Sequence, residues 1–194
     1  LARDLLRESA IAPLFVLCGS VGTGKSTVAE QIADVCGGVV IASDRTRKAL
    51  AGLAPESRAH AREGAPLYAD AMTERVYRAL LERASPVLRS GRAAILDATF
   101  ARAAQRAAAR EFAARLGARA LLVEVSCAES EARERVARRA ERGGDPSDAG
   151  PERVAPSRAE FEPPDEWPRE QAIEIATDRC TPIDYAAALR KLAG

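Results

Sequence analysis

The sequence lacks any apolar run that would cross a bilayer. Apolar stretches such as residues 120–123 are short, whereas a membrane-spanning helix needs about 20 consecutive apolar residues. The first dozen residues are charged and amphipathic, unlike a secretory signal peptide. We therefore expect a cytoplasmic protein with no membrane partner. Because the chain begins at Leu1 rather than methionine, we also expect a piece of a longer protein, with a fused upstream domain among its candidate partners.

The sequence also lacks an excess of charge of either sign. It has 29 basic and 28 acidic residues, which gives a formal net charge of +1. Proteins dedicated to nucleic-acid or membrane-surface binding usually carry a clear basic excess, so this balance disfavours both roles. Lysine is scarce, since the basic residues are nearly all arginine and the only lysines are Lys25, Lys48 and Lys191. The single histidine, His60, has no partner motif and is not expected to be catalytic.

Paired cysteines are missing as well. The four cysteines are widely spaced and form no Cys-x-x-Cys motif. This pattern favours buried thiols in a reducing compartment over a disulfide framework.

The composition, with 47% hydrophobic and 29% charged residues, predicts that residues 1–194 form one globular domain. Buried strands are expected at 14–18, 39–42, 93–97 and 120–125, with an edge strand at 173–175. Helices are expected at 2–9, 25–36, 45–53, 67–84, 101–116, 129–142 and 183–192, and Ser85-Pro86 is expected to bend or end the fourth. Strands that alternate with helices predict an α/β fold, a parallel sheet with helices on both faces.

The strongest motif is a glycine-rich segment between the first buried strand and the first long helix. Its glycines allow a tight turn whose backbone N–H groups converge on a phosphate at a helix N-terminus. In this P-loop pattern the lysine reaches the β- and γ-phosphates and the serine hydroxyl reaches Mg²⁺. We expect ATP to be bound by Gly19, Ser20, Val21, Gly22, Thr23, Gly24, Lys25, Ser26 and Thr27.

An acid ends the third apolar strand. In a P-loop protein, Asp97 at this position is the expected Walker-B-type residue, which holds Mg²⁺ directly or through water. Ligands of open α/β sheets bind at the carboxyl ends of strands, which supports this interpretation. The alternative is a helix N-cap, because Asp is a favoured cap. Ser26 and Asp97 are therefore the candidate metal ligands.

A second acid and an arginine follow the second strand. Asp44 ends that strand, and Arg47 falls one helical turn later on the same face. The carboxylate would accept the proton of an attacking hydroxyl, while the arginine would hold substrate or γ-phosphate. Ser-Asp-x-x-Arg is a weak signal, and a helix cap with a surface ion pair is the alternative.

An arginine-rich helix at 129–142 precedes a loop that contains Gly and Pro. Arg135, Arg139 and Arg142 share one face, and like charges stacked there would gain from a bound anion such as phosphate. We expect residues 129–160 to form a lid that excludes water from the γ-phosphate. Solvation is the alternative for each single arginine. A second row, Arg102, Arg106 and Arg110, is expected to be a solvated face, with an anionic acceptor as the alternative.

These segments resemble a known group of kinases over residues 13–192. The resemblance lies in residues 19–26, 43–48 and 96–100 and in the arginine-rich helix before Ser147. The group is the P-loop kinase domain called AAA-type or zeta-toxin-like. It includes polynucleotide 5′-hydroxyl kinases, and gluconate and chloramphenicol kinases are similar. The closest resemblance is to bacterial proteins in which such a domain follows an aminoglycoside-phosphotransferase-like domain.

The resemblance implies a P-loop NTPase fold with a five-stranded parallel sheet in the order 2-3-1-4-5. It implies Asp44 as general base, Arg47 as a contact of the acceptor or the transferring phosphate, and Asp97 near Mg²⁺. It also implies Arg135 or Arg139 as the catalytic lid arginine. One position departs, because polynucleotide kinases usually carry Asn where this chain has Phe100.

The leading hypothesis is an enzyme, an ATP- and Mg²⁺-dependent kinase that transfers the γ-phosphate to a hydroxyl of a small-molecule acceptor. A polynucleotide 5′-hydroxyl kinase is the nearest alternative, and the near-neutral charge and Phe100 disfavour it. A regulatory module that binds ATP without an acceptor is a third hypothesis. A GTPase is disfavoured because the sequence has no Asn-Lys-x-Asp motif.

Overall fold

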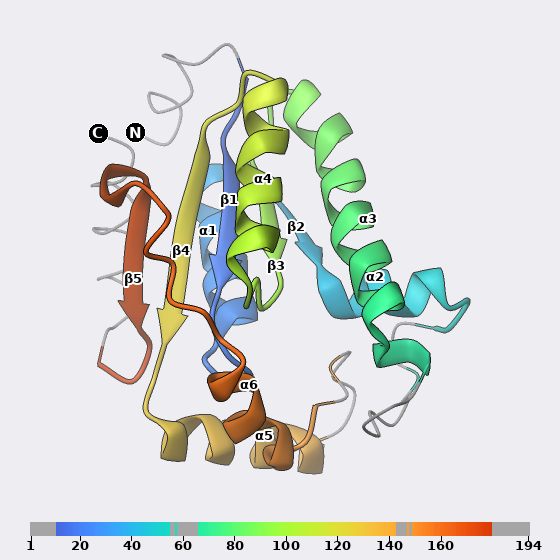
Figure 1. Ribbon diagram of the computed structural model, residues 1–194, viewed down its shortest axis with the longest axis vertical. Coiled ribbons are helices and arrows are strands. Elements are labelled where there is room, and N and C mark those ends of the chain that lie inside the picture. Colours follow the sequence, from blue (N-terminus) through green and yellow to red (C-terminus); the bar gives the residue numbers. More distant parts are fainter. Residues whose placement is uncertain (1–10, 55–56, 58–65, 143–146, 148, 180–194) are drawn as a thin grey trace.

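The computed structural model describes residues 11–54, 57, 66–142, 147 and 149–179 (Figure 1). The helices expected at 2–9 and 183–192, and His60, lie outside these residues. The strands are β1 (Leu14–Cys18), β2 (Val39–Ala42), β3 (Ala94–Asp97), β4 (Ala120–Ser126) and β5 (Ala172–Ala176). The α-helices are α1 (Lys25–Cys36), α2 (Ser43–Leu50), α3 (Asp70–Arg89), α4 (Ala103–Arg115), α5 (Glu129–Arg142) and α6 (Val154–Ala159), with 3₁₀ turns η1 (Pro66–Tyr68), η2 (Pro151–Arg153) and η3 (Arg169–Gln171).

The strands form one parallel sheet in the order β2-β3-β1-β4-β5, as the resemblance implied. The register aligns Asp97 with Leu17 of β1 and with Ala42 of β2. The chain leaves both neighbouring strands just after these positions, into the glycine-rich loop and into α2. The register therefore brings three separate candidate segments to one edge of the sheet.

Helices cover both faces of the sheet (Figure 1). On one face α3 and α4 pack on β1 and β3, and buried residues such as Leu80, Leu88 and Ala109 form a core there. On the other face α1 contributes Val28 and Ile32 to a second core. Strands covered on both faces are expected to be apolar throughout, which is the pattern that the sequence showed.

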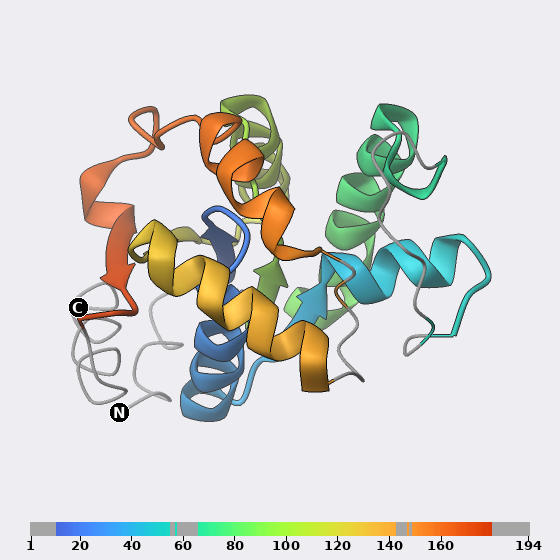
Figure 2. The same ribbon diagram turned by 90° about the horizontal axis from the view of Figure 1, so that it is seen from below.

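A third, small apolar cluster attaches α5 and α6 to the carboxyl edge of the sheet. It consists of Cys127, Ala132, Val136 and Val154, with Val21 of the glycine-rich loop packed against it. Figure 2 shows α5 lying across the strand ends, with α6 beside it. The arginine-rich helix therefore lies over the edge where the candidate segments meet.

One element differs from expectation. We expected Ser85-Pro86 to bend or end the helix, yet α3 continues through Pro86 to Arg89. Leu80, Ala84 and Leu88 recur every fourth residue and are all buried. Their packing outweighs the hydrogen bond that proline cannot donate.

None of the helices within the described ranges is both long enough and apolar enough to cross a membrane.

Candidate active site

The glycine-rich loop has the backbone of a phosphate cradle. Gly19, Gly22 and Gly24 all have positive φ values, of 140°, 84° and 92°. A Cβ on Gly22 would lie 2.7 Å from the carbonyl oxygen of Ala132 in α5, so the loop and α5 pack too closely for a side chain. Within the described residues, the amides of Gly22, Gly24 and Lys25 donate to no protein acceptor. Free amides before a helix N-terminus fit an anion such as a phosphate.

Neighbouring segments anchor this loop from outside. The Gly19 amide donates to the carbonyl of Thr99, which follows β3, at 3.0 Å. The Val21 amide donates to the Ser157 hydroxyl of α6 at 3.0 Å. Within the loop itself, Thr23 donates from its hydroxyl to the Ser20 carbonyl at 3.1 Å. The loop is thus shaped by the rest of the fold before any nucleotide binds.

Lys25 opens α1 and points back into the loop, where its Nζ donates to the Ser20 carbonyl at 2.7 Å. Burial lowers the pKa of this amine, and the carboxylates of Asp97 and Asp44 act in the opposite direction. Ser26 and Thr27, the next two residues of α1, are exposed. A partly desolvated ammonium beside free amides is suited to a phosphate chain.

Asp97 lies at the end of β3 and is 8% exposed. The next helix, α4, begins only at Ala103, so Asp97 does not cap it and the N-cap alternative is wrong. The hard oxygens of Asp97 and Ser26 are suited to Mg²⁺. Among the residues that the structure describes, no three His, Cys, Asp or Glu side chains cluster as a metal site by themselves. A P-loop Mg²⁺ site needs no such cluster, since phosphate oxygens and water supply the other ligands.

Asp44 lies in the first turn of α2 and is half-buried. Burial raises the pKa of its carboxyl, a hydrogen bond from Ser147 opposes this shift, and the charge of Asp97 adds to it. Ser147 also accepts a hydrogen bond from Arg139 Nη2 at 3.3 Å. A single hydroxyl therefore links the arginine-rich helix to this acid. A carboxylate with a raised pKa beside a phosphate cradle is a candidate general base.

Arg47 is 8% exposed, so the alternative of a surface ion pair is wrong for this residue. Its Nη1 donates to the Leu67 carbonyl at 2.8 Å and to the Thr73 hydroxyl at 3.3 Å. Its guanidinium lies 5.0 Å from the centroid of the Tyr68 ring. α2 thus presents Arg47 to η1 and α3, one turn beyond Asp44.

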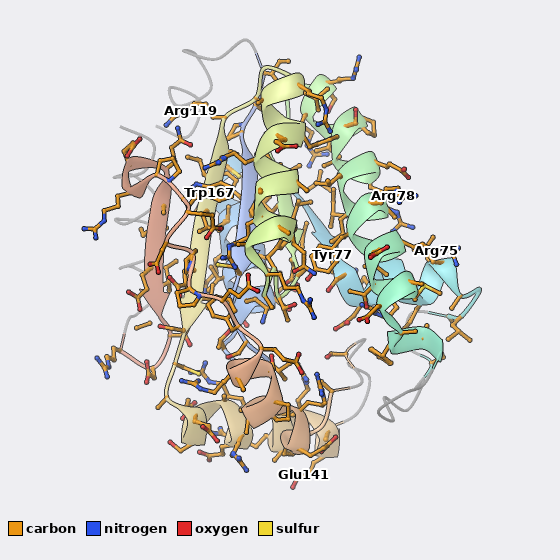
Figure 3. All side chains as sticks on the ribbon, viewed as in Figure 1. Arg75, Tyr77, Arg78, Arg119, Glu141 and Trp167 are labelled. Carbon is orange, nitrogen blue, oxygen red and sulfur yellow. The ribbon has the colours of Figure 1, made fainter. Side chains whose placement is uncertain are left out.

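Tyr77 is a half-buried residue against the loop after Asp97, and sequence reasoning missed it. Its hydroxyl lies 3.0 Å from the Thr99 hydroxyl and accepts the Phe100 amide at 3.1 Å. In Figure 3 it points from α3 toward β3 and α4, whereas Arg75 and Arg78 of the same helix point outward. Burial raises the pKa of Tyr77, and the charges of Arg47 and Asp44 both act on it. No motif marks a lone tyrosine in a helix, so only the fold reveals its position.

Phe100 has φ 39°, the only positive φ among the described non-glycine residues. Asn adopts this left-handed conformation more readily than Phe does. The ring is 1% exposed and packs edge-on against Tyr77, with centroids 4.9 Å apart. Phe100 is therefore a core residue whose backbone conformation is held by its neighbours.

Arg106 corrects the expectation of a solvated arginine row at Arg102, Arg106 and Arg110. Arg106 is fully buried and pairs with Glu166 at 2.6 Å. It also donates to the carbonyls of Phe100 and Pro163, at 2.9 and 3.1 Å. Helical spacing placed it on an outer face, but the segment after α6 folds back over α4 and covers it. It stabilises the loop after Asp97.

The lid arginines have different surroundings. Arg135 is held by Glu131 at 2.7 Å and by the Thr177 hydroxyl at 2.6 Å, on the β5 side of the loop. Arg139 lies one turn further along α5, where its charge acts on both Lys25 and Asp44. Arg142 is exposed. The three arginines therefore do not act as one face.

Comparison with known proteins identifies the family of this chain. A family model described as an AAA domain matches residues 14–164, more than half of the chain. Uncharacterised proteins of Mycobacterium bovis and Mycobacterium tuberculosis are 35% identical over 107 residues, 55% of this chain. The match spans 22% of the length of these relatives, so the chain corresponds to a minor part of them.

Solved structures of two kinases and of one further nucleotide-bound protein share the fold. A gluconokinase from Sinorhizobium meliloti superposes with a TM-score of 0.62 at 20% identity, over 93% of this chain and 89% of that one. The Mycobacterium tuberculosis APS kinase, in complex with AMPPNP and APS, gives 0.64 at 19% identity, over 95% and 99%. Chaetomium thermophilum Kti12, in complex with ADP-AlF3, gives 0.67 at 20%, over 93% and 97%.

At identities of about 20%, the solved structures show only the fold, whereas the family model shows to which family the chain belongs. The chain belongs to the AAA domain family and has the fold of a P-loop kinase-like domain.

Proposed function

We propose that this domain is an ATP-dependent phosphotransferase that moves the γ-phosphate of ATP to a hydroxyl of a small-molecule acceptor. The observation that carries the proposal is the convergence of Lys25, Asp44 and Asp97 beside a loop with free amides. A phosphate cradle alone serves many activities, but a half-buried acid with a raised pKa is what deprotonation of a hydroxyl requires. The likeness to gluconokinase and APS kinase structures supports a small acceptor.

The reaction is an in-line displacement at phosphorus. The acceptor oxygen forms a bond to the γ-phosphorus while the bond to the β–γ bridging oxygen breaks, and ADP leaves with the electron pair. Asp44 takes the proton of the acceptor hydroxyl. Residues 19–27 bind the triphosphate, and Lys25 offsets charge on the β- and γ-phosphates. When bound through Ser26 and Asp97, Mg²⁺ would neutralise part of the phosphate charge.

Of the two candidate lid arginines, we assign the catalytic role to Arg139. Arg135 is engaged by Glu131 and Thr177, so it serves to attach α5 to the loop. Arg139 lies near Lys25 and reaches Asp44 through Ser147. Its charge is therefore placed to stabilise the transferring phosphate when residues 129–160 cover the site.

The finer grouping with zeta-toxin-like and polynucleotide-kinase-like domains, a cytoplasmic location and a fused upstream domain belong to the same proposal. A polynucleotide acceptor is less well supported, because the net charge is +1 and Phe100 is buried in the core. A nucleotide-binding module with no acceptor is the other candidate, and the experiment below separates it from a kinase.

The test is Asp44→Asn, assayed by transfer of labelled γ-phosphate to a panel of hydroxyl acceptors that includes sugars and 5′-hydroxyl oligonucleotides. Loss of a general base should lower kcat by about 10²- to 10⁴-fold, while ATP affinity stays within a few-fold. Asp34→Asn, an exposed acid of α1, is the matched control and should change neither value. Tight ATP binding by the unmodified protein without labelled product from any acceptor would favour the module without an acceptor.

A further inference from the structure

One peptide group of the glycine-rich loop, the group that joins Ser20 to Val21, is held at both of its edges. Its N–H, from Val21, donates to the hydroxyl of Ser157 at 3.0 Å. Its C=O, from Ser20, accepts hydrogen bonds from the Lys25 ammonium at 2.7 Å and from the Thr23 hydroxyl at 3.1 Å. A trans peptide group is planar, and its N–H and C=O point in opposite directions. Ser157 and Lys25 therefore bind opposite edges of one rigid unit.

Ser157 is itself held firmly by its neighbours. It reaches the loop from α6, 136 positions away in the chain, and is 6% exposed. The next residue, Arg158, donates to the Cys127 carbonyl at 3.0 Å. Val154, three residues earlier, is fully buried in the apolar cluster that packs against Val21. In Figure 2, α6 lies beside α5 and the turn after β1. A packed element therefore presents the hydroxyl to the loop.

The Ser20–Val21 peptide group controls where the ammonium of Lys25 rests. Rotation of this group would break all three of its hydrogen bonds together, so Ser157 fixes the direction of the carbonyl that Lys25 contacts. An ammonium has three donors, and among the described residues Lys25 uses one of them, on Ser20. Two donors remain for phosphate oxygens. An ammonium that is held in place before binding loses little conformational freedom when a nucleotide arrives.

We propose that Ser157 is a positioning residue for Lys25. By holding the Val21 amide, its hydroxyl orients the Ser20 carbonyl and so places the lysine for the β- and γ-phosphates. Ser157 acts through the backbone and not by contact with the nucleotide. The inference rests on the ATP binding that is part of the function proposed above, and it does not depend on the acceptor. It also links α6 to the nucleotide site, because a displacement of α6 would turn the same peptide group.

The first test observes Lys25 by NMR without any ligand. The sequence has only three lysines, so isotope-labelled lysine gives few side-chain signals, and Lys25→Arg identifies the signal of Lys25. The two Hε protons of a held side chain have different chemical shifts, whereas free rotation averages them. The Lys25 pair should be separated in the unmodified protein and should converge in Ser157→Ala. A pair that is equally separated in both proteins, or already averaged in the unmodified one, would overturn the inference and leave the proposed function standing.

The second test measures the affinity for AMPPNP with Mg²⁺ by calorimetry. Ser157→Ala should raise Kd by about 10-fold, which corresponds to the loss of one well-placed hydrogen bond. Ser157→Thr, which keeps the hydroxyl, should retain most of the affinity. Ser157→Cys fills a similar space with a weaker acceptor, so it should resemble Ser157→Ala without leaving a cavity.

Ser126→Ala is the matched control, because it removes a serine hydroxyl whose hydrogen bond, to Glu174 at 3.2 Å, lies outside the loop. It should change neither the Lys25 signals nor the affinity for AMPPNP. Equal affinity of Ser157→Ala and the unmodified protein, or equally weak binding by Ser157→Ala and Ser157→Thr, would overturn the inference. Absence of AMPPNP binding by the unmodified protein would overturn the proposed function together with it, whereas the NMR comparison tests the inference alone.

Discussion

The P-loop side of the candidate site is built from backbone, whereas the proposed acceptor side is built from side chains of separate helices. Residues 19–27 form one contiguous segment whose amides and positive φ values make the cradle. The proposed acceptor side takes Asp44 and Arg47 from α2, with Tyr77 of α3 nearby, and Arg106 of α4 holds the loop after Asp97. The difference indicates which substitutions should harm each side. An added side chain should distort the P-loop, whereas loss of a single buried side chain should disrupt the proposed acceptor side.

The largest effect is expected on the acceptor side, for Arg106→Met. The change leaves Glu166 and the Phe100 and Pro163 carbonyls without their buried partner. We expect a loss of about 3 kcal/mol in the free energy of unfolding, measured by urea denaturation. Arg115→Met, at an exposed position of the same helix, should stay within about 0.5 kcal/mol. Equal effects of the two changes would refute a structural role for Arg106.

On the P-loop side, Gly22→Ala should weaken ATP binding by about 10²-fold, because a displacement of the cradle misplaces every phosphate contact. A Cβ at Gly22 would lie 2.7 Å from the Ala132 carbonyl. Gly91→Ala is the control, since Gly91 has a similar φ of 78° but nothing within 4 Å of an added Cβ. It reports the cost of the backbone conformation alone. Comparable ATP affinities in equilibrium titrations of the two variants would show that the close approach to α5 is unimportant.

Arg135 and Arg139 lie on the same helix, α5, so substitutions at these two positions compare a structural role with a catalytic role on one element. Arg139→Gln should lower kcat by about 10²-fold with little change in ATP affinity, as expected when one transition-state donor is lost. Arg135→Gln should instead reduce stability, because its bonds to Thr177 attach α5 near the loop. Steady-state kinetics and thermal unfolding of both variants measure the two effects. A larger loss of kcat in Arg135→Gln would reverse the assignment.

The smallest expected effect is on the pH dependence of the free energy of unfolding. Burial raises the pKa of Asp44 in the folded protein, so between the ordinary and the raised pKa the folded state binds more protons than the unfolded state. Stability therefore falls as pH rises through this window. Asp44→Asn should remove this pH dependence and raise the melting temperature at neutral pH, although it should lower kcat. A lower melting temperature would mean that Asp44 contributes stability through its contact with Ser147.

In the unmodified protein, kcat should rise with pH as Asp44 loses its proton, with a midpoint above the ordinary pKa of an aspartate. The pH–rate profile measures this midpoint. A profile that is flat across the acidic range would argue against Asp44 as the base.

The sheet was predictable because strand burial is recorded locally, as continuous apolar runs between helical segments. Asp97 could be found in the same way, since it directly follows an apolar run. α3 was predicted to bend or end at Pro86, because a local rule for proline does not include the packing of Leu80 and Leu88. Local signals therefore define the elements, while packing between elements decides how far they extend.

In the candidate site, too, some residues could be predicted from local sequence and others only from packing between elements. The order of residues in the P-loop is by itself enough to predict the cradle, because its chemistry comes from contiguous backbone and one lysine. Only the tertiary structure separates Arg135 from Arg139, buries Arg106, and brings Tyr77 beside Thr99. The physical reason is that a side chain's role depends on what faces it. Tyr77, Arg135 and Arg106 face Thr99, Thr177 and Glu166, which lie 22, 42 and 60 positions away in the chain.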